Sequence, residues 1–104
     1  MKSAYRIRMD FNEALADARR LDETAERMNS LAERDFQESI NNLSYAWTGN
    51  NANIFREKEE SVRREILENV KNLRNVADDI RTIARRIYEA EMRALEIARE
   101  RSSR

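Results

Sequence analysis

The chain has 104 residues, with one glycine and no proline, cysteine or histidine. Without cysteine the chain cannot form disulfides or thiolate metal sites. Without histidine it lacks the side chain that most often carries protons at neutral pH and most often binds metals. Twenty basic side chains balance twenty acidic ones, so the chain lacks the excess positive charge typical of nucleic-acid-binding proteins. A high charge content combined with regularly spaced apolar residues indicates a single domain of long helices.

The first predicted helix spans about residues 10–44. Asp10 followed by Glu13 has the spacing of an N-terminal capping box, so the helix is expected to begin there. Its apolar residues recur every three or four positions and form one face. From Met28 to Ile40 every step is four residues, so the apolar stripe drifts around the helix as it does at a coiled-coil stutter.

A break at about residues 45–50 separates this helix from a second one over about residues 51–101. The break contains the only glycine, Gly49. Glycine adopts positive φ at low cost and commonly ends helices, and Asn50 or Asn51 can cap the next one. Because the break is short, the two helices are expected to run antiparallel.

Apolar residues in the second helix include a row held seven residues apart, as in a coiled coil. A lone pair of helices is one layer thick and cannot cover an apolar stripe from both sides. We therefore predict an all-α fold in which residues 1–104 form one antiparallel two-helix hairpin, which pairs as a dimer into a four-helix bundle. The residues predicted for this core and dimer seam are Leu21, Met28, Phe36, Leu43, Ile66, Leu73, Ile80 and Ile87.

The break also carries a motif. It reads Trp47-Thr48-Gly49, with Ala52 three residues after the glycine and Phe55 three residues later. A tryptophan ring at a helix end can cover the turn, and Ala52 leaves room for it. This motif, midway along a chain of this length, resembles that of the WXG family of type VII secretion proteins. The resemblance implies a helical hairpin made in the bacterial cytoplasm, exported without a signal peptide, and found outside the cell or on its surface.

Members of this family often end the second helix with Tyr-x-x-x-Asp/Glu, which is read as part of an export signal. Here the acid that follows Tyr88 is Glu91, at the third position instead of the fourth. Either Tyr88 and Glu91 substitute for the signal, or a partner chain carries it. Pairing about the break leaves residues 88–101 with little or no first helix beside them. The alternation of Tyr5, Ile7 and Met9 suits an extended arm in residues 1–9.

The predicted function is protein binding through helices, with no enzymatic activity, cofactor or metal. No nucleophile–base pair or phosphate loop can be assembled from these residues. The longest apolar runs are three residues, so neither a signal peptide nor a membrane span is expected. The expected partners are a second hairpin, identical or different, and the type VII secretion motor or a larger secreted substrate, but not nucleic acid. Two alternatives stay open: an escort subunit for the helical domain of a larger secreted toxin, and a plain cytoplasmic coiled-coil adaptor.

Overall fold

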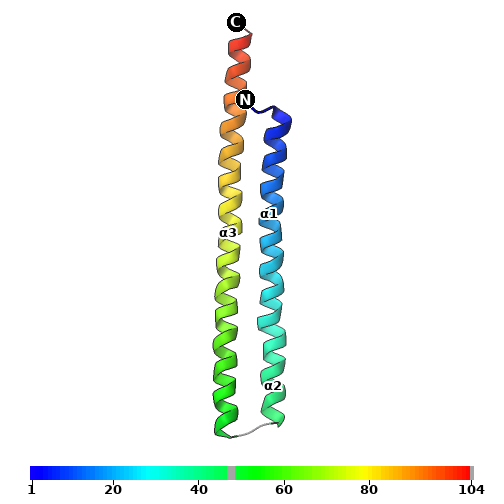
Figure 1. The fold of residues 1–104 in the computed structure, drawn as a ribbon, viewed down its shortest axis with the longest axis vertical. Helices are drawn as coiled ribbons and strands as arrows, with labels where there is room; N and C mark the ends of the chain where they lie inside the picture. Colours follow the sequence, from blue (N-terminus) through cyan, green and yellow to red (C-terminus); the bar gives the residue numbers. More distant parts are fainter. Residues whose placement is uncertain (47–48, 104) are drawn as a thin grey trace. The chain divides into compact units, whose positions relative to one another are not determined.

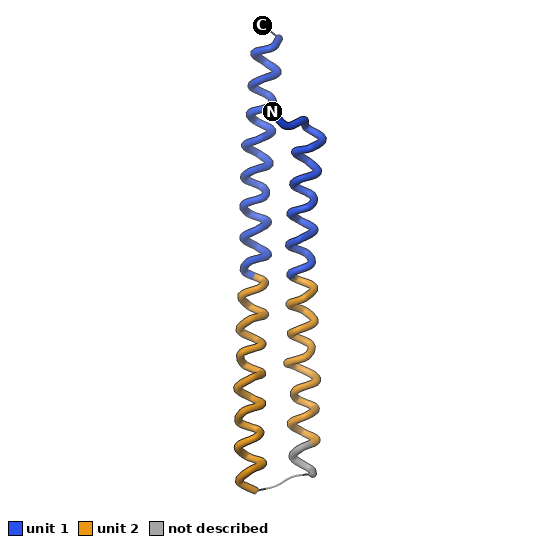
Figure 2. The backbone as a smooth tube through the Cα atoms, in the orientation of Figure 1, with its two compact units in different colours: residues 1–21, 75–104 blue, residues 22–74 orange. Residues whose placement is uncertain are grey.

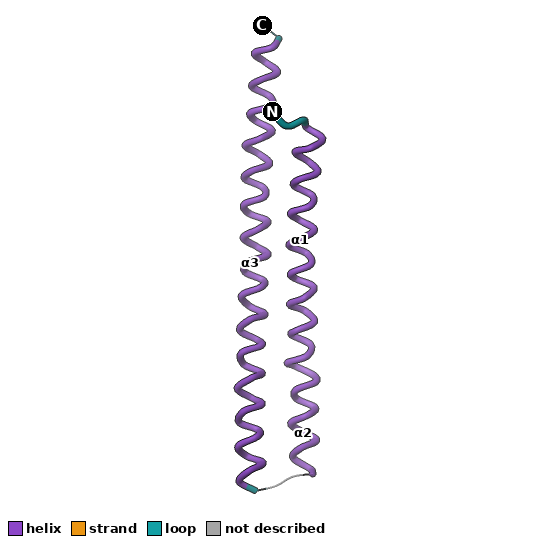
Figure 3. Tube along the Cα trace, viewed as in Figure 1, coloured by secondary structure: helices purple, strands orange, loops and turns teal. Residues whose placement is uncertain are grey.

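The computed structural model describes residues 1–46 and 49–103, apart from the side chains of residues 43–46. The described residues form helices and no strand, which confirms the all-α class. The elements are helix α1 (Ala4–Ser30), the π-helical turn η1 (Leu31–Asp35), helix α2 (Phe36–Ala46) and helix α3 (Asn50–Ser102), drawn in Figures 1 and 3.

Helix α1 begins at Ala4, so the prediction of a start at Asp10 is wrong, as is the extended arm in residues 1–9. Ser3 supplies the cap: its side-chain oxygen accepts a hydrogen bond from the backbone N–H of Arg6 at 3.1 Å. Its carbonyl accepts a second bond from the N–H of Ile7 at 3.0 Å. A serine cap satisfies backbone donors at a helix start as well as an aspartate does. Asp10 therefore lies inside the helix, where its carboxylate pairs with Arg6 at 3.1 Å.

The π-helical turn η1 lies within the segment where the apolar residues are spaced by four. Its characteristic wide hydrogen bond runs from the backbone N–H of Phe36 to the carbonyl of Leu31, five residues earlier. A spacing of four exceeds the 3.6 residues of an α-helical turn, so the stripe would drift away from its face. One wider turn absorbs this drift, and Ala32 stays buried within it.

Helix α3 begins within one residue of its predicted start and ends at Ser102. Gly49 precedes it with a φ of 108°, the positive value expected for the glycine of the break. The Gly49 carbonyl accepts the N–H of Asn53 at 3.1 Å, so Gly49 occupies the cap position predicted for Asn50 or Asn51. Trp47 and Thr48 lie outside the described residues.

The chain divides into two compact units, coloured separately in Figure 2. Unit 1 comprises residues 1–21 and 75–104, and unit 2 comprises residues 22–74. In unit 1, Lys2 pairs with Glu91 and Phe11 packs on Tyr88. In unit 2, Glu26 pairs with Arg74, Glu33 with Arg63, and Ser39 with Glu59. In both units the residue number falls on one segment as it rises on the other, so the paired segments run antiparallel.

Small side chains dominate the buried core of each unit. Ala18 and Ala77 are fully covered in unit 1, and Ala25 and Ala32 are fully covered in unit 2. Small residues between helices allow the backbones to approach closely. Among the residues whose side chains the structure describes, the other buried ones are Ile7 and Ala84 in unit 1, and Ala52 and Val70 in unit 2.

The larger residues predicted for the core and dimer seam lie beside this buried row. Ile87 is 51% exposed, and the side chain of Leu43 is outside the described residues. The others are half-buried: Leu21, Met28, Phe36, Ile66, Leu73 and Ile80. The chain's own helix pairing therefore leaves the large apolar side chains of this seam only partly covered.

Candidate protein-binding surface

The residues of the turn motif differ in their exposure. Ala52 is fully buried, whereas Gly49 is exposed and Phe55 is 44% exposed. A Cβ added to Gly49 would meet no atom within 4 Å, so backbone conformation alone requires the glycine there. Phe55 thus presents an aromatic face to solvent one and a half turns after the start of α3. The Trp47 part of the motif lies outside the described residues.

The α3 segment of unit 1 carries three parallel rows of residues, each with a seven-residue spacing. The first row, with Ala77 and Ala84, is buried against α1. The second, Ile80 and Ile87, runs along the edge of that contact. The third, Val76 and Ile83, is about half exposed, at 47% and 53%. Only the second of these rows is predicted as a heptad from the sequence, although the third has the same spacing.

Together the second and third rows form what we call the apolar seam of unit 1: Val76, Ile80, Ile83 and Ile87. Successive members are spaced by four, three and four residues, which is the spacing of a coiled-coil contact. Two exposed charges of opposite sign, Asp79 and Arg86, lie along the edge of the seam away from the buried alanines. A half-exposed apolar seam with charged flanks is the type of surface that binds another helix.

The N-terminal segment closes over part of α3 in unit 1, and we call this contact the N-terminal clasp. The Lys2 ammonium lies 2.9 Å from the Asp10 carboxylate and 3.2 Å from the Glu91 carboxylate. Next to it, the rings of Phe11 and Tyr88 have centroids 4.8 Å apart and are tilted by 36°. Tilted aromatic pairs at this separation are favourable beyond the area they bury.

The charges of the clasp shift each other's pKa values. Hydrogen bonding to Asp10, and secondarily to Glu91, raises the pKa of Lys2. The hydrogen bond from Lys2 lowers the pKa of Asp10, and the nearby Arg6 acts in the same direction. Both shifts favour the charged forms, so the clasp is held by charge at neutral pH.

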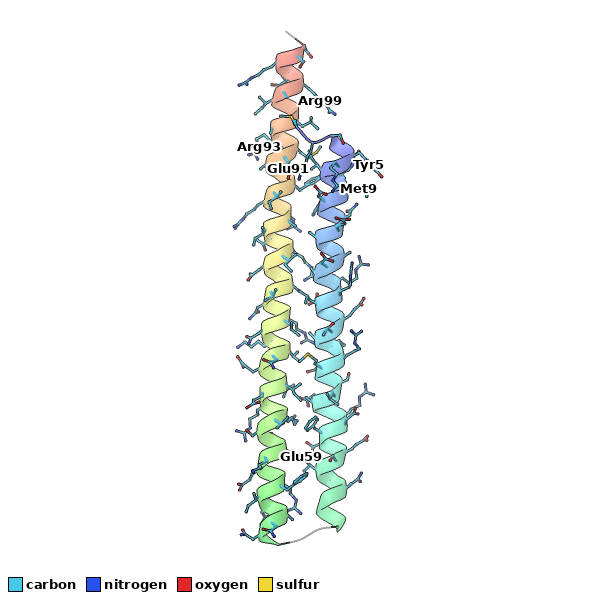
Figure 4. All side chains as sticks on the ribbon, viewed as in Figure 1. Tyr5, Met9, Glu59, Glu91, Arg93 and Arg99 are labelled. Atoms are coloured by element: carbon cyan, nitrogen blue, oxygen red, sulfur yellow. The ribbon has the colours of Figure 1, made fainter. Side chains whose placement is uncertain are left out.

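The clasp corrects the prediction that Tyr88 and Glu91 are left free for an outside protein. Residues 1–9 were expected to be extended, but Ala4–Met9 are helical and lengthen α1 alongside α3. Tyr88 and Glu91 are consequently both half-buried and have contacts within unit 1. In Figure 4, Glu91 lies beside the N-terminal segment, whereas Tyr5 and Met9 project from the side of α1 away from α3.

Other kinds of site find little support in the described part of the chain. It holds no cluster of three carboxylates placed to bind a metal ion. A hollow of about 220 Å³ lies at the clasp, lined by Ile7, Phe11 and Tyr88 among others. Pockets for small molecules are usually larger than this, at roughly 300–1,000 Å³. A second hollow of about 460 Å³, lined by Tyr88, Met92 and Arg99 among others, has lining residues on α3 alone, so no second element encloses it. None of the described helices is long and apolar enough to cross a membrane.

The comparisons with known proteins found no matching family model, no matching curated protein and no matching solved structure. The candidate surface therefore rests on the residues of this chain alone. Sequence reasoning found the Ile80 and Ile87 row, Tyr88 and Glu91. Val76 and Ile83 belong to the apolar stripe that the sequence predicts for the second helix, but their own seven-residue row was not separated from it. The clasp residue Lys2 was missed because residues 1–9 were expected to form an extended arm, whereas Phe11 was predicted as part of the apolar stripe of the first helix but not as a partner of Tyr88.

Proposed function

We propose that this protein binds another protein through its helices and is exported by a type VII secretion pathway. The observation that carries the binding function is the apolar seam of unit 1, where Val76 and Ile83 remain about half exposed after the chain has packed on itself. Contiguous apolar surface that a chain does not cover itself commonly marks a protein-binding site. The seam has coiled-coil spacing, so its partner is a helix, and a dimeric four-helix bundle is the assembly that best covers it.

The export function rests on the turn motif. Trp47-Thr48-Gly49, followed by Ala52 and Phe55, resembles the mid-chain motif of WXG-family proteins. The positive φ of Gly49 and the exposed ring of Phe55 are consistent with a turn that presents side chains to the export machinery. The protein would then leave the bacterial cytoplasm without a cleaved signal peptide and act outside the cell or at its surface.

Fractionation of the native bacterial culture tests the export function. The protein is expected in the medium or on the cell surface, and disabling the type VII secretion motor should leave it in the cytoplasm. Trp47→Ala and Phe55→Ala should reduce export. A matched variant, Ala25→Leu, perturbs the buried core of unit 2 instead. If the amount exported simply falls with thermal stability across all three variants, the turn motif has no separate role in export. That outcome, or a protein found only in the cytoplasm, would contradict the proposal and favour a plain adaptor.

An escort role is the second candidate, and the N-terminal clasp favours it. Tyr88 packs on Phe11 and Glu91 pairs with Lys2, so neither side chain of the shifted tail signal is free. A partner chain would then carry the export signal, and this protein would accompany it. Under the escort role, deleting the partner gene should abolish export of this protein, whereas Tyr88→Ala should leave export unchanged once stability is accounted for. Export that persists without any partner would reject the escort role.

A further inference from the structure

One backbone carbonyl in η1 connects the wide turn to Arg63. In an ordinary α-helix the N–H of Phe36 would donate to the carbonyl of Ala32, four residues earlier. It donates instead to the carbonyl of Leu31, so the Ala32 carbonyl loses its usual helical donor. The Nε of Arg63 supplies a replacement at 3.1 Å, in a partly buried contact. Arg63 thus satisfies the backbone group that the wide turn leaves free.

The sequence of α2 also fits a second form, in which η1 is an ordinary α-helical turn. Ala25 and Ala32 are fully buried and lie seven residues apart. Seven residues make about two α-helical turns, so an unbroken helix would place Ser39, another small residue, next in the same buried row. With the wide turn, Ser39 is exposed instead, and its hydroxyl donates to Glu59 at 3.1 Å. Each form therefore gives Ser39 a different environment.

Ile40 explains why the wide form is favoured while Arg63 is in place. Ile40 is half-buried in the observed structure. In an unbroken helix it would take the position that Glu33 and Glu26 have, seven and fourteen residues earlier, and both of these are exposed. The α-helical form therefore exposes a large apolar side chain. The wide form avoids this exposure but needs a donor for its freed carbonyl.

We propose that η1 is a two-state switch, which Arg63 holds in its wide form. When the guanidinium leaves the Ala32 carbonyl, the Phe36 N–H replaces it, and α2 rotates by one residue position, about 100°, relative to the helix before it. This rotation moves Ser39 into the buried row and exposes Ile40, so it changes the surface that α2 presents. All of these residues lie in unit 2. The inference goes beyond the proposed function and does not rest on it.

Alkylation of a single cysteine tests the switch in the full-length chain. The chain has no cysteine, so Ser39→Cys introduces the only thiol, and its rate of reaction with iodoacetamide reports its exposure. Adding Arg63→Met should slow this reaction by at least about threefold, because about two-thirds or more of the molecules would then bury the thiol. A turn that is merely loosened would react at the same rate or faster. Amide exchange does not separate these cases, since both allow the turn to open.

Asn41→Cys provides the matched control. Asn41 is exposed, and so are Arg34 and Arg27, which lie seven and fourteen residues earlier. Position 41 is therefore exposed in both forms, and its alkylation should be equally fast with and without Arg63→Met.

Deleting Arg34 provides a second control. Removing one residue from η1 lets an ordinary α-helix keep α2 in its observed orientation. In that chain Ser39→Cys should react as fast as it does with the wild-type turn, whether residue 63 is arginine or methionine.

Either of two outcomes would overturn the inference. The first is a Ser39→Cys thiol that reacts as fast after Arg63→Met as before it, or faster. The second is a slowing that persists in the chain without Arg34, because rotation at η1 could not cause it. Circular dichroism checks that each variant remains helical. If Arg63→Met unfolds the chain, Arg63→Lys takes its place, because lysine keeps the charge but cannot form the fork, and an unchanged alkylation rate there would overturn the inference equally.

Discussion

At the scale of single residues, Lys2 connects the start of the chain to two separate positions. It pairs with Asp10 on α1 and with Glu91 on α3, and both contacts lie in unit 1. The pKa of Asp10 is lowered, so its contribution to stability is present above the unfolded pKa of about 4 and is lost as the pH falls through the folded value. The pKa of Lys2 is raised, so its contribution is present below about pH 10.4 and is lost as the pH rises through the folded value.

Lys2→Met should therefore lower the melting temperature at pH 7, and the difference from wild type should shrink as the pH falls below the unfolded pKa of about 4 and through the lowered pKa of Asp10. Thermal melts followed by circular dichroism between pH 2.5 and 7 measure this difference. Lys58→Met removes an equal charge from an exposed site on α3 and should show no such dependence. A wild-type to Lys2→Met difference of the same size at pH 3 and pH 7 would show that the Lys2–Asp10 pair does not stabilise the fold.

The buried alanines give a second test at this scale. Ala25 is fully covered in unit 2, and a leucine there would force the paired helices apart. Overpacking of this kind typically costs ~1–3 kcal/mol in the free energy of unfolding. Glu23→Leu, at an exposed site two residues earlier, should change the free energy of unfolding by less than about 0.5 kcal/mol. Chemical denaturation of both variants compares the two sites, and equal stability would mean that the alanine row is not closely packed.

At the scale of elements, η1 is tied to α3 by one side chain. The Arg63 Nε donates to the carbonyl of Ala32 at 3.1 Å, and its Nη2 donates to both carboxylate oxygens of Glu33 at 3.0 and 3.1 Å. Its Nη1 donates to Glu60 at 3.1 Å. Burial lowers the pKa of Arg63, but pairing with Glu33 and Glu60 outweighs this and leaves the pKa raised. The guanidinium fork thus joins the wide turn to the facing helix of unit 2.

Arg63→Met should loosen η1. The backbone amide hydrogens of η1 should exchange with solvent at least about tenfold faster than in the wild type, because charge-assisted hydrogen bonds to this turn are lost. Arg63→Lys keeps the charge but cannot form the fork, so it should give an intermediate rate. Arg64→Met, at an exposed neighbouring site, is the control. Hydrogen exchange measured by mass spectrometry reports all three, and unchanged exchange in residues 31–36 of Arg63→Met would show that the turn does not depend on Arg63.

Several elements followed from local sequence signals, and others did not. The start of α3 was predicted because an isolated glycine precedes a long run of regularly spaced apolar residues. The start of α1 was missed because Ser3 and the Asp10–Glu13 pair are both good caps, and local rules cannot rank them. The drift from Met28 to Ile40 is visible as a change in spacing, but local spacing does not show the π-helical turn or its hydrogen bond from Arg63, which lies 31 residues from Ala32 in sequence.

At the scale of the whole molecule, the sequence indicates how much apolar surface exists but not how it is divided. It predicted one broad stripe on α3 and the need for a second covering layer. It did not show that alanines would take the contact with α1, because alanine and isoleucine both count as apolar in a periodicity argument. Close packing favours the small side chains at that contact. Larger residues such as Ile83 and Ile87 are therefore left about half exposed.

This division predicts that the thermal stability of the protein depends on its concentration. If copies of the chain cover each other's apolar seams, unfolding also separates the copies, and mass action raises the melting temperature as concentration rises. For a dimer of this size the shift should be about 3 °C for each tenfold increase. Thermal melts at about 1, 10 and 100 µM test this prediction, because a protein that needs no second copy has the same melting temperature at every concentration.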